Sequence, residues 1–239
     1  MIKAAIEKIL EISENKIHEI NGNFYTEKPV TLINSPVYKP RSIGVNSLDS
    51  LVKLINEEGV TANVGKLFVR VSSHNEVEVF SSYSDQYERA YLYKAESDSP
   101  RMCTNCYEDY EKTMVLLRSA FIPNEGTAYL LDILSRISNE ESVQSSDNGM
   151  TQTVEVRKGI ALQAKEAVKS RVKLIPYRTF LEVEQPESEF LVRLNKDGEI
   201  AFFEADGGMW KLNAKDRIAS YLEKALADHI SSGAVVVMR

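Results

Sequence analysis

Several features that would assign this chain to a familiar class are scarce or missing. Its 239 residues include only two cysteines, Cys103 and Cys106, too few for the disulfide framework that holds small secreted domains together. No run approaches the ~18 consecutive apolar residues that a membrane span needs. The first 20 residues alternate charged and apolar side chains, without the continuous apolar centre of a secretion signal. We therefore expect a cytoplasmic protein with no membrane among its partners.

Neither sign of charge dominates the chain. The formal net charge is −6, with 27% charged residues, so the whole-chain field weakly repels a phosphate backbone and is far from that of an acidic DNA mimic. One stretch is nevertheless basic: it contains Arg157, Lys158, Lys165, Lys169, Arg171 and Lys173. A local patch of this kind keeps nucleic acid open as a partner.

Length and composition allow one large core or two small ones, because 43% of the residues are hydrophobic. Between 139 and 149 the sequence is polar, with Val143 as an isolated apolar residue, which is typical of an exposed linker. We predict two domains, 1–140 and 150–239, joined by a linker at 141–149.

The first half reads as helices flanking a strand meander. Helical spacing of apolar residues predicts a helix over 2–20 and a second over 48–59, capped by Asn46 or Ser47 and stopped by Gly59. Prolines surround a short edge strand at 30–33. The remaining elements of this half are strands at 66–71, 76–80 and 89–94, the first two forming a hairpin, and helices at 107–121 and 127–137.

The second half reads as a sheet followed by a helix. Strands are expected at 151–157, 171–175, 178–184, 188–194, 199–205 and 235–238, with a tight turn at 196–198 and a helix over 214–230. The order lacks the regular strand–helix alternation of a doubly wound sheet. We predict the α+β class: an N-terminal α/β meander region and a C-terminal antiparallel sheet with a packed helix. Edge strands at 30–33 and 235–238 predict a homo-oligomer, because self-association covers unpaired backbone groups.

The two cysteines form a lone Cys-x-x-Cys at the start of the helix expected from 107, where the helix dipole would favour a reactive thiol. A structural zinc site needs four ligands, and the three histidines are scattered at His18, His74 and His229. The missing ligands favour no role for this pair over an intermolecular zinc or redox role.

Carboxylates gather in the second half. If 178–184 is a strand, alternation places Arg178, Glu182 and Glu184 on one face, where two carboxylates could hold Mg²⁺ for phosphodiester chemistry. The commoner arrangement is a solvated face on which Arg178 and Arg193 pair with glutamates of neighbouring strands. We predict no catalytic residue, metal site or cofactor.

Asp206, Gly207, Gly208 and Trp210 form the most distinctive local string. Paired glycines allow a turn with positive φ, and a turn that leads into a buried Trp is the usual arrangement. The alternative is a ligand loop, in which backbone N–H groups hold an anion and Trp210 stacks on a base. The candidate ligand-binding residues are thus Arg178, Glu182, Glu184, Asp206, Gly207, Gly208 and Trp210.

Two strings in this region carry a resemblance. Residues 176–190, PYRTFLEVEQPESEF, and 203–211, FEADGGMWK, resemble a family of uncharacterised bacteriophage and prophage proteins, and residues 45–56 and 76–80 are similar to it more weakly. The resemblance covers most of the chain, implies a bacterial cytosol as the setting, and supplies no assigned activity. Cys103 and Cys106 lie outside the family pattern.

Three functions remain open. The first is a non-enzymatic, phage-encoded binding protein that acts on a host or phage protein during infection, by blocking a defence system or assisting phage DNA metabolism. The second is a protein that binds a small nucleotide or second messenger through Gly207, Gly208, Trp210 and Arg178. The third is a metal-dependent phosphodiesterase or nuclease built on the carboxylates.

Overall fold

The computed structural model describes residue 3 and residues 17–20, 23–26, 41–61, 65–84, 87–100, 102–137, 142–147, 151–158, 161–195 and 199–239. The chain forms two compact units, Met1–Lys39 and Pro40–Arg239. In the first unit, β1 (Ile17–Ile20) and β2 (Asn23–Thr26) pair as an antiparallel hairpin. The predicted helix over 2–20 is therefore wrong for its last four residues. The strand predicted at 30–33 lies outside the described residues.

The second unit begins with a five-stranded sheet in the order β15-β4-β5-β6-β3. The hairpin of β4 (Leu67–Ser73) and β5 (Glu76–Ser81) continues into β6 (Tyr91–Glu96), all antiparallel. The two outer strands, β3 (Ile43–Val45) and β15 (Val235–Met238), run parallel to their neighbours. The predicted hairpin and the final strand at 235–238 are confirmed.

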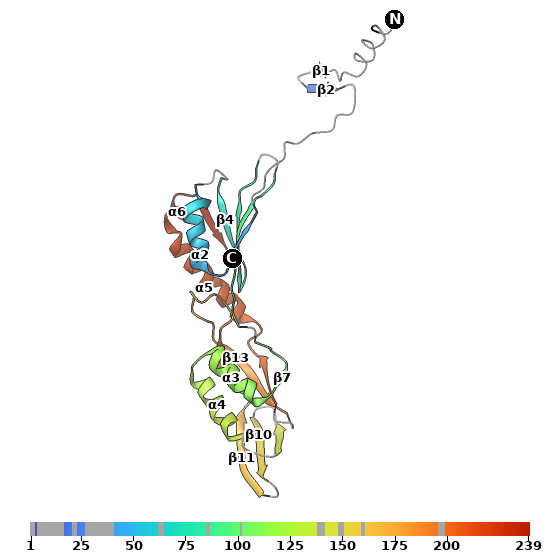
Figure 1. The fold of residues 1–239 in the computed structure, drawn as a ribbon, viewed down its shortest axis with the longest axis vertical. Helices are drawn as coiled ribbons and strands as arrows, with labels where there is room; N and C mark the ends of the chain where they lie inside the picture. The colour runs from blue at the N-terminus through green and yellow to red at the C-terminus, as the bar shows by residue number, and fades with distance from the viewer. Residues whose placement is uncertain are drawn as a thin grey trace. The chain divides into compact units, whose positions relative to one another are not determined.

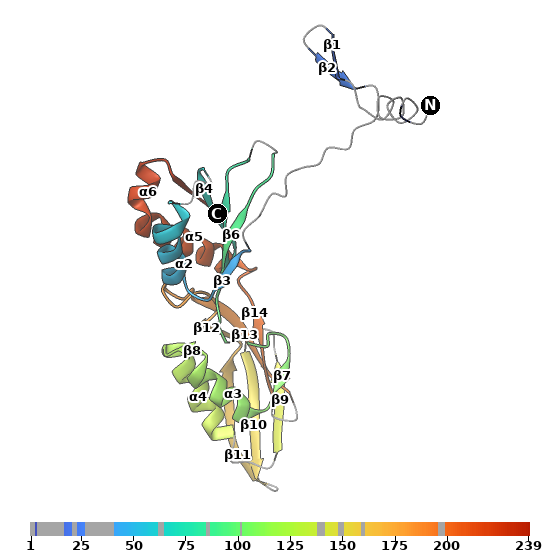
Figure 2. The ribbon, with the colours of Figure 1, turned by 45° about the horizontal axis from the view of Figure 1, so that its top comes forward.

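Helices from both ends of this unit cover one face of that sheet (Figures 1 and 2). They are α2 (Leu48–Leu54), which continues as the π-helical turn η1 (Ile55–Gly59), α5 (Met209–Ala225) and α6 (Ala227–Ser231). The Ser47 side chain caps α2 as predicted, and Gly59 ends η1. Leu51, Val79 and Leu222 are among the fully buried residues of this first core.

A second five-stranded sheet has the order β7-β14-β13-β12-β8. Its strands are β7 (Tyr107–Glu108), β8 (Phe121–Ile122), β12 (Arg171–Pro176), β13 (Ser188–Leu194) and β14 (Ile200–Glu204), all antiparallel. The helices α3 (Tyr110–Ser119) and α4 (Glu125–Ile137) contribute Leu117, Leu130 and Leu134 to a second core with the sheet residues Phe190 and Phe202. The β13–β14 hairpin is confirmed, while its turn at 196–198 lies outside the described residues.

A three-stranded antiparallel sheet lies between α4 and β12 in the sequence. It consists of β9 (Ser142–Asp147), β10 (Thr151–Lys158) and β11 (Ala161–Lys169). Strand β9 lies inside the segment read as a linker, and β11 has no counterpart among the sequence predictions. The first core combines residues 48–95 with residues 180–183 and 218–235, and the second combines 117–134 with 172–202. Both cores therefore take residues from either side of 141–149.

The fold is α+β, as predicted. One predicted strand is wrong: residues 178–184 form turns, because the side chain of Gln185 takes up the backbone groups of this segment. The helix predicted from 214 begins at Met209. Among the described helices, none combines the length and apolar character needed to cross a membrane.

Candidate functional site

Arg178 is the centre of a buried polar network. It follows Pro176, which ends β12, and only 8% of its surface is exposed. Its Nη1 donates to Oε1 of Glu204 at 3.1 Å, and its Nη2 donates to Oγ of Ser188. The guanidinium carbon lies 3.8 Å from the ring centroid of Trp210. Burial lowers the pKa of Arg178 to about 10, so the group stays charged at neutral pH. A buried cation is tolerated here because a carboxylate, a hydroxyl and an aromatic face surround it.

The Asp-Gly-Gly turn starts α5 and completes this network. Gly207 and Gly208 adopt φ values of 64° and 82°, which side chains other than glycine rarely reach. The Asp206 carboxylate accepts hydrogen bonds from the N–H groups of Gly208 at 3.0 Å and Trp210 at 3.3 Å, and from the Ser188 hydroxyl at 3.0 Å. Asp206 thus caps the helix through its own side chain.

Trp210 is buried, as the simpler interpretation of its turn predicted. It is 4% exposed, and its Nε1–H donates to the same Glu204 oxygen that accepts from Arg178, at 3.1 Å. Its neighbour Lys211 is exposed, with the ammonium 5.6 Å from the Trp210 ring centroid. One carboxylate therefore holds both the guanidinium and the indole in place.

The loop between β12 and β13 is shaped by one side chain that sequence reasoning missed. Oε1 of Gln185 accepts from the N–H groups of Arg178 at 2.9 Å and Thr179 at 3.1 Å. Its Nε2 donates to the Phe180 carbonyl at 2.9 Å. The Thr179 hydroxyl donates to the His74 carbonyl at 2.5 Å, which joins this loop to the β4–β5 turn 105 residues away. The sequence around Gln185 contains no pattern that predicts these contacts, because glutamine side chains usually lie in solvent.

A cavity of about 650 Å³ lies beside the network. Its wall includes Arg178, Trp210 and Lys211, together with His74 from the β4–β5 turn and Asp98 from the segment after β6. The His74 ring meets Trp210 edge-on, with 4.6 Å between the ring centroids. Burial, followed by the positive charges of Lys211 and Arg178, lowers the pKa of His74, so this ring is neutral at neutral pH.

The two glutamates predicted beside Arg178 lie elsewhere. Oε1 of Glu182 accepts from the N–H groups of Leu48 at 2.7 Å and Asp49 at 3.3 Å, so Glu182 helps to cap α2. The Glu184 side chain is 80% exposed and pairs with Arg217 at 3.5 Å. The expected face of paired carboxylates does not form, because 178–184 is not a strand. In the part of the chain that the structure describes, no three His, Cys, Asp or Glu side chains gather as a metal site.

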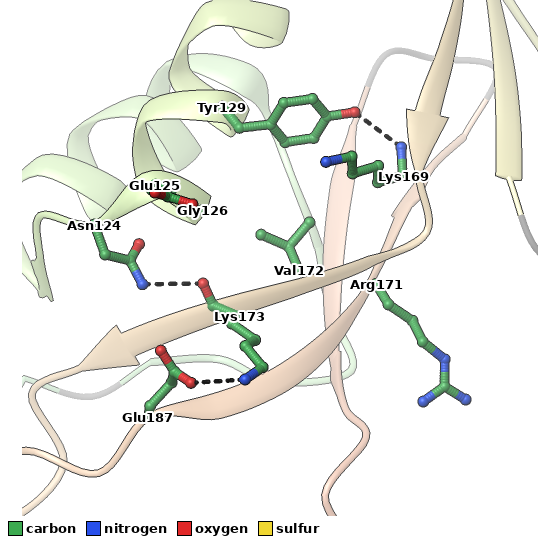
Figure 3. Close-up of a pocket in the computed structure, with 9 residues that line it drawn as sticks. All are labelled: Asn124, Glu125, Gly126, Tyr129, Lys169, Arg171, Val172, Lys173 and Glu187. Atoms are coloured by element: carbon green, nitrogen blue, oxygen red, sulfur yellow. Dashed lines mark hydrogen bonds and ion pairs between the residues drawn. The ribbon is translucent and has the colours of Figure 1, made fainter.

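The basic stretch borders a second cavity, of about 350 Å³, at the start of α4 (Figure 3). Asn124 joins the helix to β12: its Nδ2 donates to the Lys173 carbonyl at 3.1 Å, and its Oδ1 accepts from the Thr127 N–H at 2.9 Å. The hydroxyl of Tyr129 accepts from the Lys169 N–H at 2.9 Å (Figure 3). These bonds hold α4 against β12 and the end of β11.

The cations around this second cavity already have partners. Lys173 pairs with Glu187 at 3.2 Å (Figure 3), and Arg171 pairs with Glu189 at 2.8 Å. The Lys169 ammonium lies over the Tyr129 ring. The side chains of Arg157, Lys158 and Lys165 lie outside the described residues. The described part of the basic stretch is thus largely neutralised, and the first cavity is the stronger candidate site.

Cys103 and Cys106 are bonded to each other as a disulfide. They precede β7, and α3 begins only at Tyr110, so the expected position at a helix start is wrong. The N–H of Asn105, between the two cysteines, donates to the Phe202 carbonyl at 2.9 Å. This bond fixes the loop to β14.

Comparison with known proteins adds no relative: no family model, no curated protein and no solved structure matches the chain.

Proposed function

We propose that this chain is a binding protein whose first cavity holds a small nucleotide or second messenger. The observation that carries the proposal is the wall of that cavity, where Arg178 is stacked on Trp210 and flanked by Lys211 and His74. A volume of about 650 Å³ falls in the usual range for small-molecule sites. The wall is also polar, with a few side chains that can fix the orientation of a ligand.

The charges of the wall suit a molecule with both donors and acceptors. Phosphate oxygens would accept from Lys211 and from the edge of His74, while Glu96 and Asp98 could accept from the amino groups of a base. Arg178 is already paired with Glu204, so its role is to set the shape and polarity of the wall. This division of roles favours a nucleotide over a simple anion.

The two strings on which the resemblance to phage proteins rests also build this candidate site. Residues 176–190 and 203–211 supply Arg178, Gln185 and Trp210, and so build both the network and the adjoining cavity wall. The resemblance implies the cytosol of a bacterial host as the setting that we propose. In that setting the protein would act on host or phage machinery during infection, through a defence system or through phage DNA metabolism.

A panel of nucleotides and cyclic nucleotides, screened by thermal unfolding, tests the proposal. A ligand at 100 times its dissociation constant adds about 2.7 kcal/mol, which raises the melting temperature by roughly 5 to 11 °C for a unit of this size. Lys211→Ala removes the proposed phosphate contact and should abolish most of the shift. Lys224→Ala, at the other end of α5 and also exposed, should keep it. An unchanged melting temperature across the whole panel would count decisively against a nucleotide site.

Self-association accompanies this proposal. Strand β15 lies at an edge of its sheet, and so does β3, so both offer unpaired backbone groups to a second copy. Light scattering at micromolar protein should give a mass above that of one chain, and a monomer would refute it. Native mass spectrometry of protein from infected cells would then report the oligomer, any retained nucleotide and any bound host or phage protein.

A further inference from the structure

Among the residues that the structure describes, no helix covers the second face of the first sheet. In both views α2, α5 and α6 lie on a single side of it (Figures 1 and 2). The alternation of buried and exposed residues places Val69 and Val79 on the helical side, so Phe68, Arg70 and Phe80 belong to the other face.

The open face is divided into two halves of different chemistry. Towards the β4–β5 turn, ion pairs cover it: Arg70 pairs with Glu78, and Lys94 lies 2.8 Å from Glu76 and 3.3 Å from Glu96. The charged side chains of this half pair with one another in solvent. Such exposed ion pairs contribute little to stability and do not require a binding partner to cover them.

The other half carries a row of aromatic rings across three neighbouring strands. The rings of Phe68 and Phe80 are stacked with 5.7 Å between centroids, and Phe80 lies 5.5 Å from Tyr91. Phe80 is 7% exposed, whereas Tyr91 is 49% exposed. The row is therefore buried at Phe80 and exposed at Tyr91.

Arg89 lies over the rings of Phe68 and Phe80. Its guanidinium carbon is 3.9 Å from the centroid of the Tyr83 ring, 5.0 Å from Phe68 and 5.2 Å from Phe80. Its Nη1 donates to the Ser81 carbonyl at 2.9 Å, which holds the side chain in place. A fixed cation among aromatic faces is a preformed element for recognition of anions with flat groups.

The connection between β5 and β6, together with the first residue of β6, exposes three tyrosines at intervals of four residues. Tyr83 is 61% exposed and Tyr87 is 85% exposed, in addition to Tyr91. Tyr87 has φ of 58°, a conformation that costs a residue with a side chain about 1–2 kcal/mol. Exposed rings collected in one place mark a binding surface, because isolated large apolar groups usually scatter over a protein. We call Phe68, Phe80, Tyr83, Arg89 and Tyr91 the tyrosine–arginine patch.

We infer that the tyrosine–arginine patch binds single-stranded nucleic acid. Tyr91 is 49% exposed, and Tyr83 is 61% exposed although Arg89 lies over one side of its ring, so both offer ring surface on which successive bases stack. Arg89, together with the exposed Lys66 that directly precedes β4, provides positive charge for the phosphates between those bases. The proposal is independent of the nucleotide cavity, which takes its wall from other residues.

Charge complementarity favours a nucleic acid over an apolar protein segment. A protein side chain packed on Tyr83 would cover Arg89 without supplying an anion, whereas a phosphate matches it. The chain as a whole has a formal charge of −6, so attraction is local and the number of neutralised phosphates is small. With two or three phosphates, the affinity should fall with salt with a logarithmic slope between roughly −1.4 and −2.1.

Fluorescence anisotropy with labelled dT20, U20 and a 20-base-pair duplex tests the inference on the full chain. Both single strands should bind at low salt and the duplex should bind more weakly. Tyr83→Ala and Tyr91→Ala should each weaken binding by about 5- to 150-fold, the range measured for loss of one base–aromatic stack. Tyr91→Phe keeps the ring and should keep the affinity. Tyr107→Ala removes a tyrosine that is 44% exposed on β7, outside the patch, and should change nothing.

The outcomes separate the alternatives. Lys211→Ala should leave dT20 binding intact, and Tyr83→Ala should leave the nucleotide shift intact, so that either proposal can fail alone. Absence of dT20 and U20 binding at low salt overturns the inference, as does equal loss in Tyr107→Ala. If Tyr83→Ala instead changes the mass seen by light scattering without any effect of nucleic acid, the patch is an interface between two copies and the inference is wrong.

Discussion

Replacing Gly126 by alanine is a sharp test of how α4 packs on β12. A Cβ at Gly126 would lie 2.1 Å from the Lys173 carbonyl oxygen and 2.8 Å from Cγ1 of Val172. Real Cβ atoms do not come within 3.0 Å of other heavy atoms, and the nearest neighbour here is backbone, which cannot turn away. The start of the helix must therefore move off the strand, and the bond between Asn124 and the Lys173 carbonyl lengthens with it.

The magnitude follows from three contributions. Overpacking costs about 1–3 kcal/mol and the lost hydrogen bond about 0.5–1.5 kcal/mol. Against these, removing a glycine from a helix gains about 0.5–1 kcal/mol. We expect Gly126→Ala to lower the free energy of unfolding by about 2 kcal/mol, within bounds of roughly 0.5 and 4, which lowers the melting temperature by about 4–8 °C.

Far-UV circular dichroism and Trp210 fluorescence, followed in parallel during thermal unfolding, provide the assay. The matched control is Gly44→Ala in β3, where an added Cβ meets nothing within 4 Å and φ is ordinary. This control should be neutral or more stable by up to about 1 kcal/mol. If Gly126→Ala melts at or above the temperature of the wild type, the close approach of α4 to β12 is refuted.

Three further predictions concern the candidate site. Glu182→Ala should lower the free energy of unfolding by about 0.5–2 kcal/mol through loss of the α2 cap, while Glu184→Ala should stay within about 0.5 kcal/mol; urea unfolding compares them. Arg178→Met should cost about 3–5 kcal/mol by leaving Glu204 without its cation, and adding Glu204→Gln should recover part of that loss in a double-mutant cycle. Burial and nearby cations lower the pKa of His74 below 6.5 in the folded chain. As pH decreases, His74 therefore takes up a proton in the unfolded chain before it does so in the folded chain. Stability should therefore fall as pH decreases through 6.5, and less steeply in His74→Gln.

Elements with a local cause could be predicted from the sequence. The β4–β5 hairpin follows from strict alternation, with Val69 and Val79 facing the core, around a polar turn. The start of α2 follows from the Ser47 side chain, which caps the helix in the structure. The turn at Gly207 and Gly208 also follows from residue type, because few residues other than glycine accept a positive φ. The turn leads into a buried Trp210, as predicted.

The errors arise where distant contacts decide the conformation. Residues 178–184 alternate like a strand, yet Gln185 takes their backbone hydrogen bonds and Pro176 ends the preceding strand. Glu182 then turns to α2, 134 residues away in the sequence. His74 reaches Trp210 only through folding, and nothing beside it in the chain signals that contact. Arg178, Asp206 and Trp210 could therefore be predicted from the sequence as members of one site, while Glu182 and Glu184 were wrong.

The division of the first core between early and late residues has a consequence for synthesis. Strands β4 to β6 leave the ribosome well before α5 and β15, which complete their core. At about 5–20 residues per second, the roughly 110 residues between the end of β6 and the start of α5 take about 6 to 22 s to translate. During that interval only α2 and η1, which precede β4 in the chain, can cover Val69, Val79 and their neighbours, and the area that α5 later covers stays exposed. The nascent chain is therefore expected to be a client of chaperones that hold exposed apolar strands, and its yield should depend on them more than that of a protein whose cores close in sequence order.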